Sequence, residues 1–206
     1  MSHEQSPSGS ITVPRELSKE DVSDFRERVS IIAESLFAEQ GADNVSMRQI
    51  AEILGVSAMT PYRYFQDKDE ILAAVRTRSF VAFAERLESA YADAPNEPRA
   101  KALAVHKAYL DFAFDNEHRY KLMFDLDQGD ERQYPDLVAA VARARKSMTA
   151  YVVDLIDARL IKGEPQQLGE LIWSASHGAI VLEMARKLPP GSARVLAKQL
   201  EERLLG

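Results

Sequence analysis

Apolar residues recur with helical spacing along almost the whole chain after Ser18. Sustained alternation of β-branched residues and Asn-Gly turns are nearly absent, so the pattern predicts no sheet. A first helix is expected from about Lys19 to Gln40. Its apolar positions follow the i, i+3, i+4, i+7, i+8 stripe of a helix that turns one face to a core: Val29, Ile32, Ala33, Leu36 and Phe37. The pattern therefore predicts an all-α protein.

Two short helices follow the first, and glycines mark the turns beside them. Gly41 lies where a left-handed C-terminal cap belongs, and Ser46 begins a capping box for the second helix. Gly55 permits a positive φ at the next turn. Ser57 can then open a third helix that runs through Phe65.

Six longer helices complete an expected total of about nine. The first of the six starts at the cap Asp67, has Glu70 at the capping-box position and runs to about Ala92. The other five are expected at Glu97–Asp115, Glu117–Asp127, Pro135–Ile161, Pro165–Lys187 and Ser192–Leu204. The segment Gly129–Pro135 is expected to be a flexible loop. The chain then divides into a flexible N-terminal arm (1–18), a three-helix domain (19–66) and a helical C-terminal domain (67–206).

The two short helices have the spacing of a helix-turn-helix. Ala51 is small where one helix must approach the other, and Gly55 follows four residues later. The interior of the motif is filled by Ile50, Leu54 and Val56. Such a motif places its second helix in the major groove of DNA. An Ala-x3-Gly pattern alone recurs by chance, so the flanking residues decide how specific the motif is.

The run LFAEQGADNVSMRQIAEILGVSAMTPYRYFQDKDEILAAV resembles the N-terminal domain of the TetR family of regulators. The matching positions are Leu36-Phe37, Gly41, Ile50-Ala51, Gly55-Val56-Ser57, Tyr62, Tyr64-Phe65, Lys68 and Leu72. The resemblance implies a helix-turn-helix DNA-binding domain over 19–66, followed by a regulatory domain for ligand binding and dimerisation over 67–206.

The resemblance also implies nine DNA-binding residues. Arg48 is assigned to a base or a phosphate, and base contacts are assigned to the exposed side of the third helix, at Ser57, Ala58, Met59 and Arg63. Phosphate contacts are assigned to Thr60, Tyr62, Tyr64 and Lys68. Structural roles remain open for several of these residues: Arg48 and Arg63 as solvated charges, Ser57 as a cap, and Met59 and Tyr64 as packing residues.

Pro61 departs from the commoner family pattern, which has an apolar residue such as Leu at this position. Proline has no N–H to donate to the Ser57 carbonyl, and it disfavours helical geometry at Thr60. We therefore predict a distorted or 3₁₀ first turn in the third helix. The alternative is a regular helix that starts at Pro61 with Thr60 as its cap.

Dimerisation is implied for the last two long helices. Apolar and small residues follow helical spacing between Pro165 and Leu188, at Leu168, Leu171, Ile172, Ala175, Ala179, Leu182 and Ala185. This pattern fits a helix that packs against a second copy, and it also fits an internal core helix. Two copies would present two third helices to a palindrome.

A ligand pocket is implied for the C-terminal domain. Its candidate lining residues are His106, Tyr109, Phe112, Tyr120, Met123, Phe124, Trp173 and His177, and His118 is a further polar candidate. Trp173, His177 and Gly178 form a Trp-x3-His-Gly motif found in some TetR-type domains. Because Trp173 and His177 are four residues apart, they share a helix face. Core packing is the alternative role for the whole set.

Composition narrows the function classes. The net charge of −6 means that a DNA-binding surface must concentrate its cations locally, at Arg48, Arg63 and Lys68, and should show a modest salt dependence. There is no cysteine, which excludes disulfides and thiolate metal sites and suits a reducing cytoplasm. We find no His-Glu-x-x-His, Gly-rich phosphate loop or Gly-x-Ser-x-Gly, so we expect no enzyme, metal or cofactor. Neither a membrane span nor a signal peptide is expected.

The working hypothesis is a cytoplasmic, homodimeric TetR-type repressor. It would bind a palindromic double-stranded operator and be released by a small apolar or amphipathic effector. The alternative is a helical protein-interaction module that has the TetR-like fold and does not bind DNA, which the acidic net charge keeps open.

Overall fold

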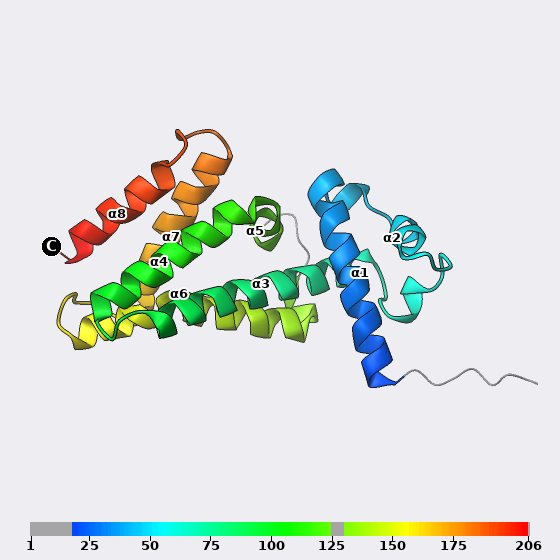
Figure 1. Ribbon diagram of the computed structural model, residues 1–206, viewed down its shortest axis with the longest axis horizontal. Coiled ribbons are helices and arrows are strands. Elements are labelled where there is room, and N and C mark those ends of the chain that lie inside the picture. The colour runs from blue at the N-terminus through cyan, green and yellow to red at the C-terminus, as the bar shows by residue number, and fades with distance from the viewer. Residues whose placement is uncertain (1–17, 125–129, 206) are drawn as a thin grey trace, which may run out of the picture.

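The computed structural model describes residues 18–124 and 130–205, and these ranges contain eight α-helices and no strand (Figure 1). The helices are α1 (Lys19–Gln40), α2 (Met47–Leu54), α3 (Lys68–Asp93), α4 (Pro98–Asp115), α5 (Glu117–Met123), α6 (Pro135–Asp157), α7 (Pro165–Met184) and α8 (Ser192–Leu205). The all-α class is confirmed. Residues 1–17 of the expected arm lie outside the described residues. The expected helix Glu117–Asp127 is wrong at its end, because α5 stops at Met123 and Phe124 has the non-helical angles φ −120° and ψ 19°.

The capping box of α2 forms as the sequence predicts. The Ser46 hydroxyl accepts from the backbone N–H of Gln49, and the Gln49 side chain accepts from the backbone N–H of Ser46. Gly55 then adopts left-handed geometry, with φ 69° and ψ 31°. Gly41 also has a positive φ, 79°, but its ψ of 148° lies outside the left-handed helical region. The positive φ predicted at Gly55 is therefore confirmed, and the left-handed cap predicted at Gly41 is wrong.

The expected third α-helix, Ser57–Phe65, is replaced by a 3₁₀ turn, η2 (Pro61–Arg63). The Ser57 carbonyl accepts from the N–H of Thr60 at 2.9 Å, because Pro61 has no N–H with which to make the α-helical bond. The predicted 3₁₀ distortion is confirmed, and it extends beyond the first turn. Thr60 itself has helical angles, φ −62° and ψ −46°. The prediction that Pro61 forces Thr60 out of helical geometry is therefore wrong. The total of about nine helices is one too high for the same reason.

The N-terminal lobe, formed by α1, α2 and residues 55–67, has a core of its own. Buried apolar side chains from α1 and α2 meet Phe65, the first turns of α3 and one residue of α5. They include Val29, Phe37, Ile50, Ile71, Val75 and Leu122. Because Ile71 and Val75 belong to α3, this core continues directly into the long helix that leaves the lobe.

The C-terminal bundle, formed by α3–α8, surrounds a second and larger core. Figure 1 shows α3 running out of the N-terminal lobe and lying along α6, with α4, α7 and α8 stacked on one side of this pair. Phe83 and Leu87 of α3 are fully buried in this core. The single helix α3 therefore contributes to both cores and connects them.

Helices α6 and α7 end earlier than the sequence predicts, and each is followed by an arginine with a positive φ. Arg159 and Arg186 adopt positive φ values of 59° and 57° after α6 and α7. The following residues donate back five positions, Leu160 to Leu155 and Lys187 to Leu182, which is the bonding of a Schellman cap. The predicted ends at Ile161 and Lys187 are therefore wrong by three or four residues.

The crossing of α6 and α7 is close at Gly169. A Cβ placed on this glycine would lie 2.5 Å from Thr149 Cγ2 and 2.9 Å from Thr149 Cβ. The two helices could not approach this closely with a larger residue at this position.

Within the described ranges, no helix is both long enough and apolar enough to cross a membrane.

Candidate DNA-binding surface and effector site

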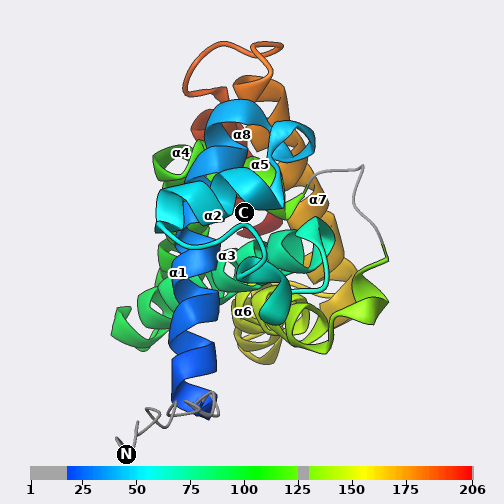
Figure 2. The same ribbon diagram turned by 90° about the vertical axis from the view of Figure 1, so that its right-hand side faces the viewer.

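Five of the nine predicted DNA-binding residues lie exposed and without polar partners on the N-terminal lobe. Within the described part of the chain, no hydrogen bond or ion pair involves a side chain of Arg48, Ala58, Met59, Tyr62 or Arg63, although the backbone N–H of Arg63 donates to the Thr60 carbonyl. Met59 is 68% exposed and Tyr62 is 49% exposed, which is high for apolar and aromatic side chains. Figure 2 looks onto this end of the molecule, where α2 and the η2 turn face outward, away from the bundle.

The other four predicted residues are engaged within the protein. The hydroxyls of Ser57 and Thr60 lie 2.8 Å apart in a hydrogen bond. Tyr64 stacks on Phe25 with ring centroids 4.1 Å apart. The Lys68 ammonium donates to the backbone carbonyls of Ala42 at 2.7 Å and Asp43 at 3.1 Å.

Lys68 and Tyr64 therefore stabilise the candidate DNA-binding surface through contacts within the protein, and their side chains do not project from it. Lys68 ties the start of α3 to η1 (Ala42–Asn44), the 3₁₀ turn that precedes α2. Tyr64 ties the end of the η2 turn to α1 through its ring, and its carbonyl accepts from Arg26. Together these contacts hold Arg48 and the η2 turn at fixed positions on one lobe.

Ion pairs occupy much of the acidic charge near this surface. Arg26 lies 2.8 Å from Glu70, and Arg78 pairs with Glu27 at 2.9 Å and with Glu34 at 3.1 Å. These carboxylates are paired with basic side chains, but the net charge of the chain stays at −6, so the concern raised by that charge remains.

Most of the predicted pocket residues are packed together in the bundle core, and we call this group the aromatic cluster. Tyr109, Phe112, Tyr120 and Met123 are buried, and Phe124, Trp173 and His177 are partly buried against them. The Tyr120 hydroxyl lies 2.7 Å from the Tyr109 hydroxyl and 2.7 Å from His177 Nδ1. Burial raises the pKa of both tyrosines above the ordinary range, so both hydroxyls stay protonated.

Two small internal voids lie beside His106, and the smaller one is also lined by Tyr109 and Trp173 of this cluster. They measure about 10 Å³ and about 30 Å³. A drug-sized ligand needs a few hundred Å³, so this conformation is closed around the aromatic cluster. Effector binding among these residues stays a prediction, and it would require side chains or helices to move.

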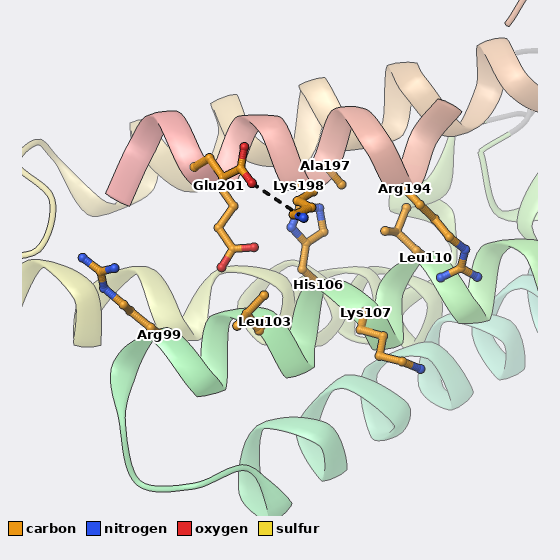
Figure 3. Close-up of a pocket in the computed structure, with 10 residues that line it drawn as sticks. Arg99, Leu103, His106, Lys107, Leu110, Arg194, Ala197, Lys198 and Glu201 are labelled. Carbon is orange, nitrogen blue, oxygen red and sulfur yellow. Dashed lines mark ion pairs between the residues drawn. The ribbon is translucent and has the colours of Figure 1, made fainter. Parts of the chain in front are cut away.

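His106 connects the closed cluster to a much larger groove. It lines both internal voids and also an outer groove of about 630 Å³ between α4 and α8 (Figure 3). Its Nε2 lies 3.0 Å from the Ser176 hydroxyl on α7. Among the predicted pocket residues, His106 is the one that reaches a cavity of ligand size.

The other groove residues were missed by the sequence analysis. Arg99, Leu103 and Lys107 repeat every four residues on α4, and Arg194 and Lys198 do so on α8. That spacing places each set on one helix face. The signal was therefore present, but basic residues on a helix face are also the ordinary pattern of a solvated surface.

Acidification should destabilise the protein through its partly buried histidines, His106 and His177. Burial lowers the pKa of His106 and of His177. Below the unfolded pKa of about 6.5, the unfolded chain binds more protons than the folded protein does. The contribution of the two neutral histidines to the free energy of unfolding is therefore fully present above that pH and is lost as the pH falls below it. The loss is at most about 1.4 kcal/mol per pH unit for each histidine.

Urea unfolding at pH 7.5 and pH 5.5 measures this effect. The drop in unfolding free energy between the two pH values should be smaller in His106→Gln than in the wild type. The exposed His118, replaced by Gln, is the control and should leave the drop unchanged. An equal drop in unfolding free energy in the wild type and in His106→Gln would contradict the role of His106 in this pH dependence.

Helix α5 contacts both halves of the molecule through adjacent residues. Arg119 Nε donates to Glu34 of α1 at 2.6 Å, while Tyr120 bonds to His177 of α7 and Tyr109 of α4. The end of α5 is also held to α3, because Arg76 donates to the Met123 carbonyl at 3.1 Å.

An apolar stripe lies uncovered on α7 and α8. Its exposed or half-exposed members on α7 include Leu171, Ala175, Gly178 and Leu182, which follow helical spacing. A shallow groove of about 420 Å³ runs between this face and Leu196 of α8. Trp173 and His177 point to the opposite, inner side of α7, with ring centroids 6.2 Å apart. The Trp-x3-His-Gly motif therefore contributes its aromatic residues to the core and its glycine to the outer face.

A helix-turn-helix lobe joined to an α-helical bundle through the long helix α3 defines this chain as a helix-turn-helix regulatory protein. Residues 32–75 match the bacterial regulatory proteins of the tetR family, and residues 102–204 match the tetracyclin repressor-like C-terminal domain. The second match alone covers half of the chain. The chain belongs to the tetR family, whose members are DNA-binding transcriptional regulators.

Individual relatives agree with this assignment. An HTH-type transcriptional regulator of Staphylococcus aureus (strain USA300) is 38% identical over 65 residues, which are 32% of this chain and 35% of that protein. The matched part thus spans about a third of the length of this curated relative.

Two solved structures share the fold over most of the chain. A protein of unknown function from Rhodococcus sp. RHA1 has a TM-score of 0.77 at 23% identity, covering 87% of this chain and 93% of that one. The transcriptional regulator FadR from Bacillus subtilis, solved in complex with stearoyl-CoA, has a TM-score of 0.70 at 18% identity, covering 87% and 97%.

Proposed function

We propose that this protein is a homodimeric repressor that binds a palindromic operator through Arg48 and the η2 turn and is released by a small effector. The observation that carries the DNA-binding part is the exposed set Arg48, Met59, Tyr62 and Arg63 on one end of the N-terminal lobe. Arginine can grip guanine O6 and N7 with two hydrogen bonds, Met59 offers apolar contact to thymine methyl groups, and Tyr62 can donate to phosphate.

The remaining predicted contacts have supporting roles in this proposal. Ser57, Ala58 and Thr60 lie on the same turn and approach the DNA backbone or base edges. Tyr64 and Lys68 hold the turn and α2 in position, as their contacts with Phe25 and Ala42 suggest. The DNA-binding domain comprises residues 19–66 and the regulatory domain residues 67–206.

Dimerisation supplies the second DNA-reading turn. The uncovered stripe on α7 and α8 is the surface that we assign to the partner copy, because an isolated chain would leave Leu171, Leu182 and Leu196 in water. Two-fold symmetry then relates the two η2 turns, and a palindromic operator matches that symmetry.

Effector release requires a path from the bundle to the N-terminal lobe. Helix α5 provides this path, since Arg119 is hydrogen-bonded to Glu34 of α1 while Tyr120 is hydrogen-bonded to His177 in the aromatic cluster. An effector that separates Tyr120 from His177 or Tyr109 would move α5 and so change the position of the lobe. The effector shifts the balance only by its differential affinity for the two states. The FadR neighbour, solved with stearoyl-CoA, is consistent with an amphipathic effector.

Replacing Arg63 by Ala should weaken operator binding by about 30-fold or more per dimer, since the dimer loses two specific contacts of about 1–3 kcal/mol each. Tyr62→Phe, which removes one hydroxyl, should weaken binding less. Fluorescence anisotropy with the DNA immediately upstream of the protein's own gene measures both. The matched control is Arg132→Ala, which removes the same charge from an exposed site on the 3₁₀ turn Glu131–Gln133.

The same titrations test the alternative, a protein-interaction module that does not bind DNA. The net charge of −6 favours that alternative, and so does the engagement of Lys68 with backbone carbonyls. Failure of the wild type to bind any palindrome in that DNA would support it. If DNA binding occurs, its affinity should fall only modestly with salt, because Arg48 and Arg63 supply few phosphate contacts. A slope as steep as that of a highly basic binder would contradict the proposed surface.

A further inference from the structure

The groove between α4 and α8 has the size and the apolar floor of a ligand site. Its volume is about 630 Å³, within the usual range for small-molecule sites. Leu103, His106 and Leu110 rise from α4 toward α8, and Ala197 of α8 faces them (Figure 3). Leu103 is 52% exposed, so an apolar side chain lies open to solvent inside the groove.

The groove is basic although the protein is acidic. Four of its ten lining residues are Lys or Arg and two are Glu, whereas the chain as a whole carries a net charge of −6. Lys198 lies 3.8 Å from Glu202, so that pair is balanced. The excess of positive charge lies at the end of the groove that holds Lys107 and Arg194 (Figure 3).

At that end, two cations share one carboxylate. Asp111 lies 2.5 Å from the Lys107 ammonium and 2.8 Å from Arg194 Nη1. Burial opposes ionisation of Asp111, but the hydrogen bonds from Lys107 and Arg194 hold its pKa below the usual value, so it is ionised at neutral pH. One unit of positive charge is left over, and a second anionic group would balance it.

The charged side of this groove lies apart from the proposed dimer face, and the two grooves share only the buried Ala197 among their lining residues. Arg194 and Lys198 line the α4 side of α8, whereas Leu196 and Gln199 line the groove toward α7. Dimerisation through the α7–α8 stripe would therefore leave the α4–α8 groove open to solvent.

We infer that the α4–α8 groove binds an anionic amphipathic molecule, such as a medium-chain carboxylate. The apolar chain lies over Leu103, Leu110 and Ala197, and the anionic group lies against Lys107 and Arg194. His106 lies between the apolar chain of the ligand and the two internal voids. It is therefore the residue through which a ligand in the groove contacts the aromatic cluster. The inference rests on the proposed function, since it gives the chemical class of the effector and its site.

Direct binding of three probes with equal chains tests the chemistry of the site. Isothermal titration calorimetry on the full-length protein without DNA uses decanoate, decanol and decylamine. Decanoate should bind about tenfold more tightly than decanol, which is the effect of one charge-assisted contact. Decylamine should bind most weakly of the three, because its ammonium meets Lys107 and Arg194.

Four variants then locate the site. Arg194→Gln should weaken decanoate about tenfold and leave decanol unchanged, whereas Leu103→Asp should weaken both probes. The matched controls lie on α6: Arg143→Gln removes an arginine that pairs with Glu88, and Val153→Asp replaces an exposed apolar residue. Both controls should bind all probes as the wild type does. Equal affinity of the wild type for decanoate and decanol, or unchanged decanoate binding in Arg194→Gln and Leu103→Asp, would overturn the inference.

Operator release is measured separately, so that the two proposals can fail independently. If decanoate binds in the groove as described and the operator complex survives saturating decanoate, the site stands and the effector role fails. If decanoate does not bind while the operator is bound normally, the groove inference fails and the DNA-binding function stands.

Discussion

A Leu182→Arg variant should be monomeric and should bind operator DNA about 100-fold or more less tightly than the wild type. Leu182 is 46% exposed in the apolar stripe of α7 and lines the groove beside Leu196 of α8. A charged guanidinium there could not be buried against a partner copy without losing its hydration. A monomer would present one η2 turn to half of the palindrome, so the gain from simultaneous binding at two half-sites, commonly 100-fold or more, would be lost.

Sedimentation equilibrium and DNA-binding anisotropy measure the two parts of this prediction. Val153→Arg is the matched control, because Val153 is also 46% exposed but lies on α6. It should remain dimeric and bind DNA normally. A Leu182→Arg protein that stays dimeric at micromolar concentration would show that the α7–α8 stripe is not the dimer interface.

A Phe83→Ala variant should lose about 3–5 kcal/mol of unfolding free energy, a large part of the stability of an ordinary domain. Phe83 is fully buried on α3, and its ring centroid lies 5.3 Å from that of Tyr109 and 5.0 Å from that of Phe112, in edge-to-face geometry. Truncation removes both ring contacts and leaves a cavity in the middle of the bundle.

Urea unfolding at one fixed protein concentration measures the loss, since dimerisation makes stability depend on concentration. Phe83→Leu retains most of the buried volume and should lose much less. A loss below about 1 kcal/mol in Phe83→Ala would mean that the aromatic cluster repacks around the missing ring.

The sequence was most informative where local chemistry alone determines the structure. Side chains bonding to a helix's own first N–H groups fixed the start of α2 at Ser46, and Gly55 fixed the turn after it. The 3₁₀ geometry around Pro61 followed from one missing N–H. Such features depend on a few neighbouring residues and so can be predicted without the rest of the fold.

The sequence was less informative where a distant contact decides. Arg159 and Arg186 end their helices in a left-handed conformation that usually selects glycine, so the residue type at these two positions does not mark the helix end. The aromatic residues of the predicted pocket share a cluster, but their periodicity could not show how tightly they close it. Nor could it show that α8 packs against α4 to form a groove, because that depends on how elements about 90 residues apart meet.

The link through α5 has a thermodynamic consequence. Arg119 and Tyr120 are consecutive, so a rotation of this short helix that breaks the contacts of Tyr120 in the bundle also displaces Arg119 from Glu34. Coupling between two binding sites is reciprocal. If an effector lowers the affinity for operator DNA by a given factor, bound operator must lower the affinity for the effector by the same factor. A dimer on its operator would then respond to higher effector concentrations than a free dimer does.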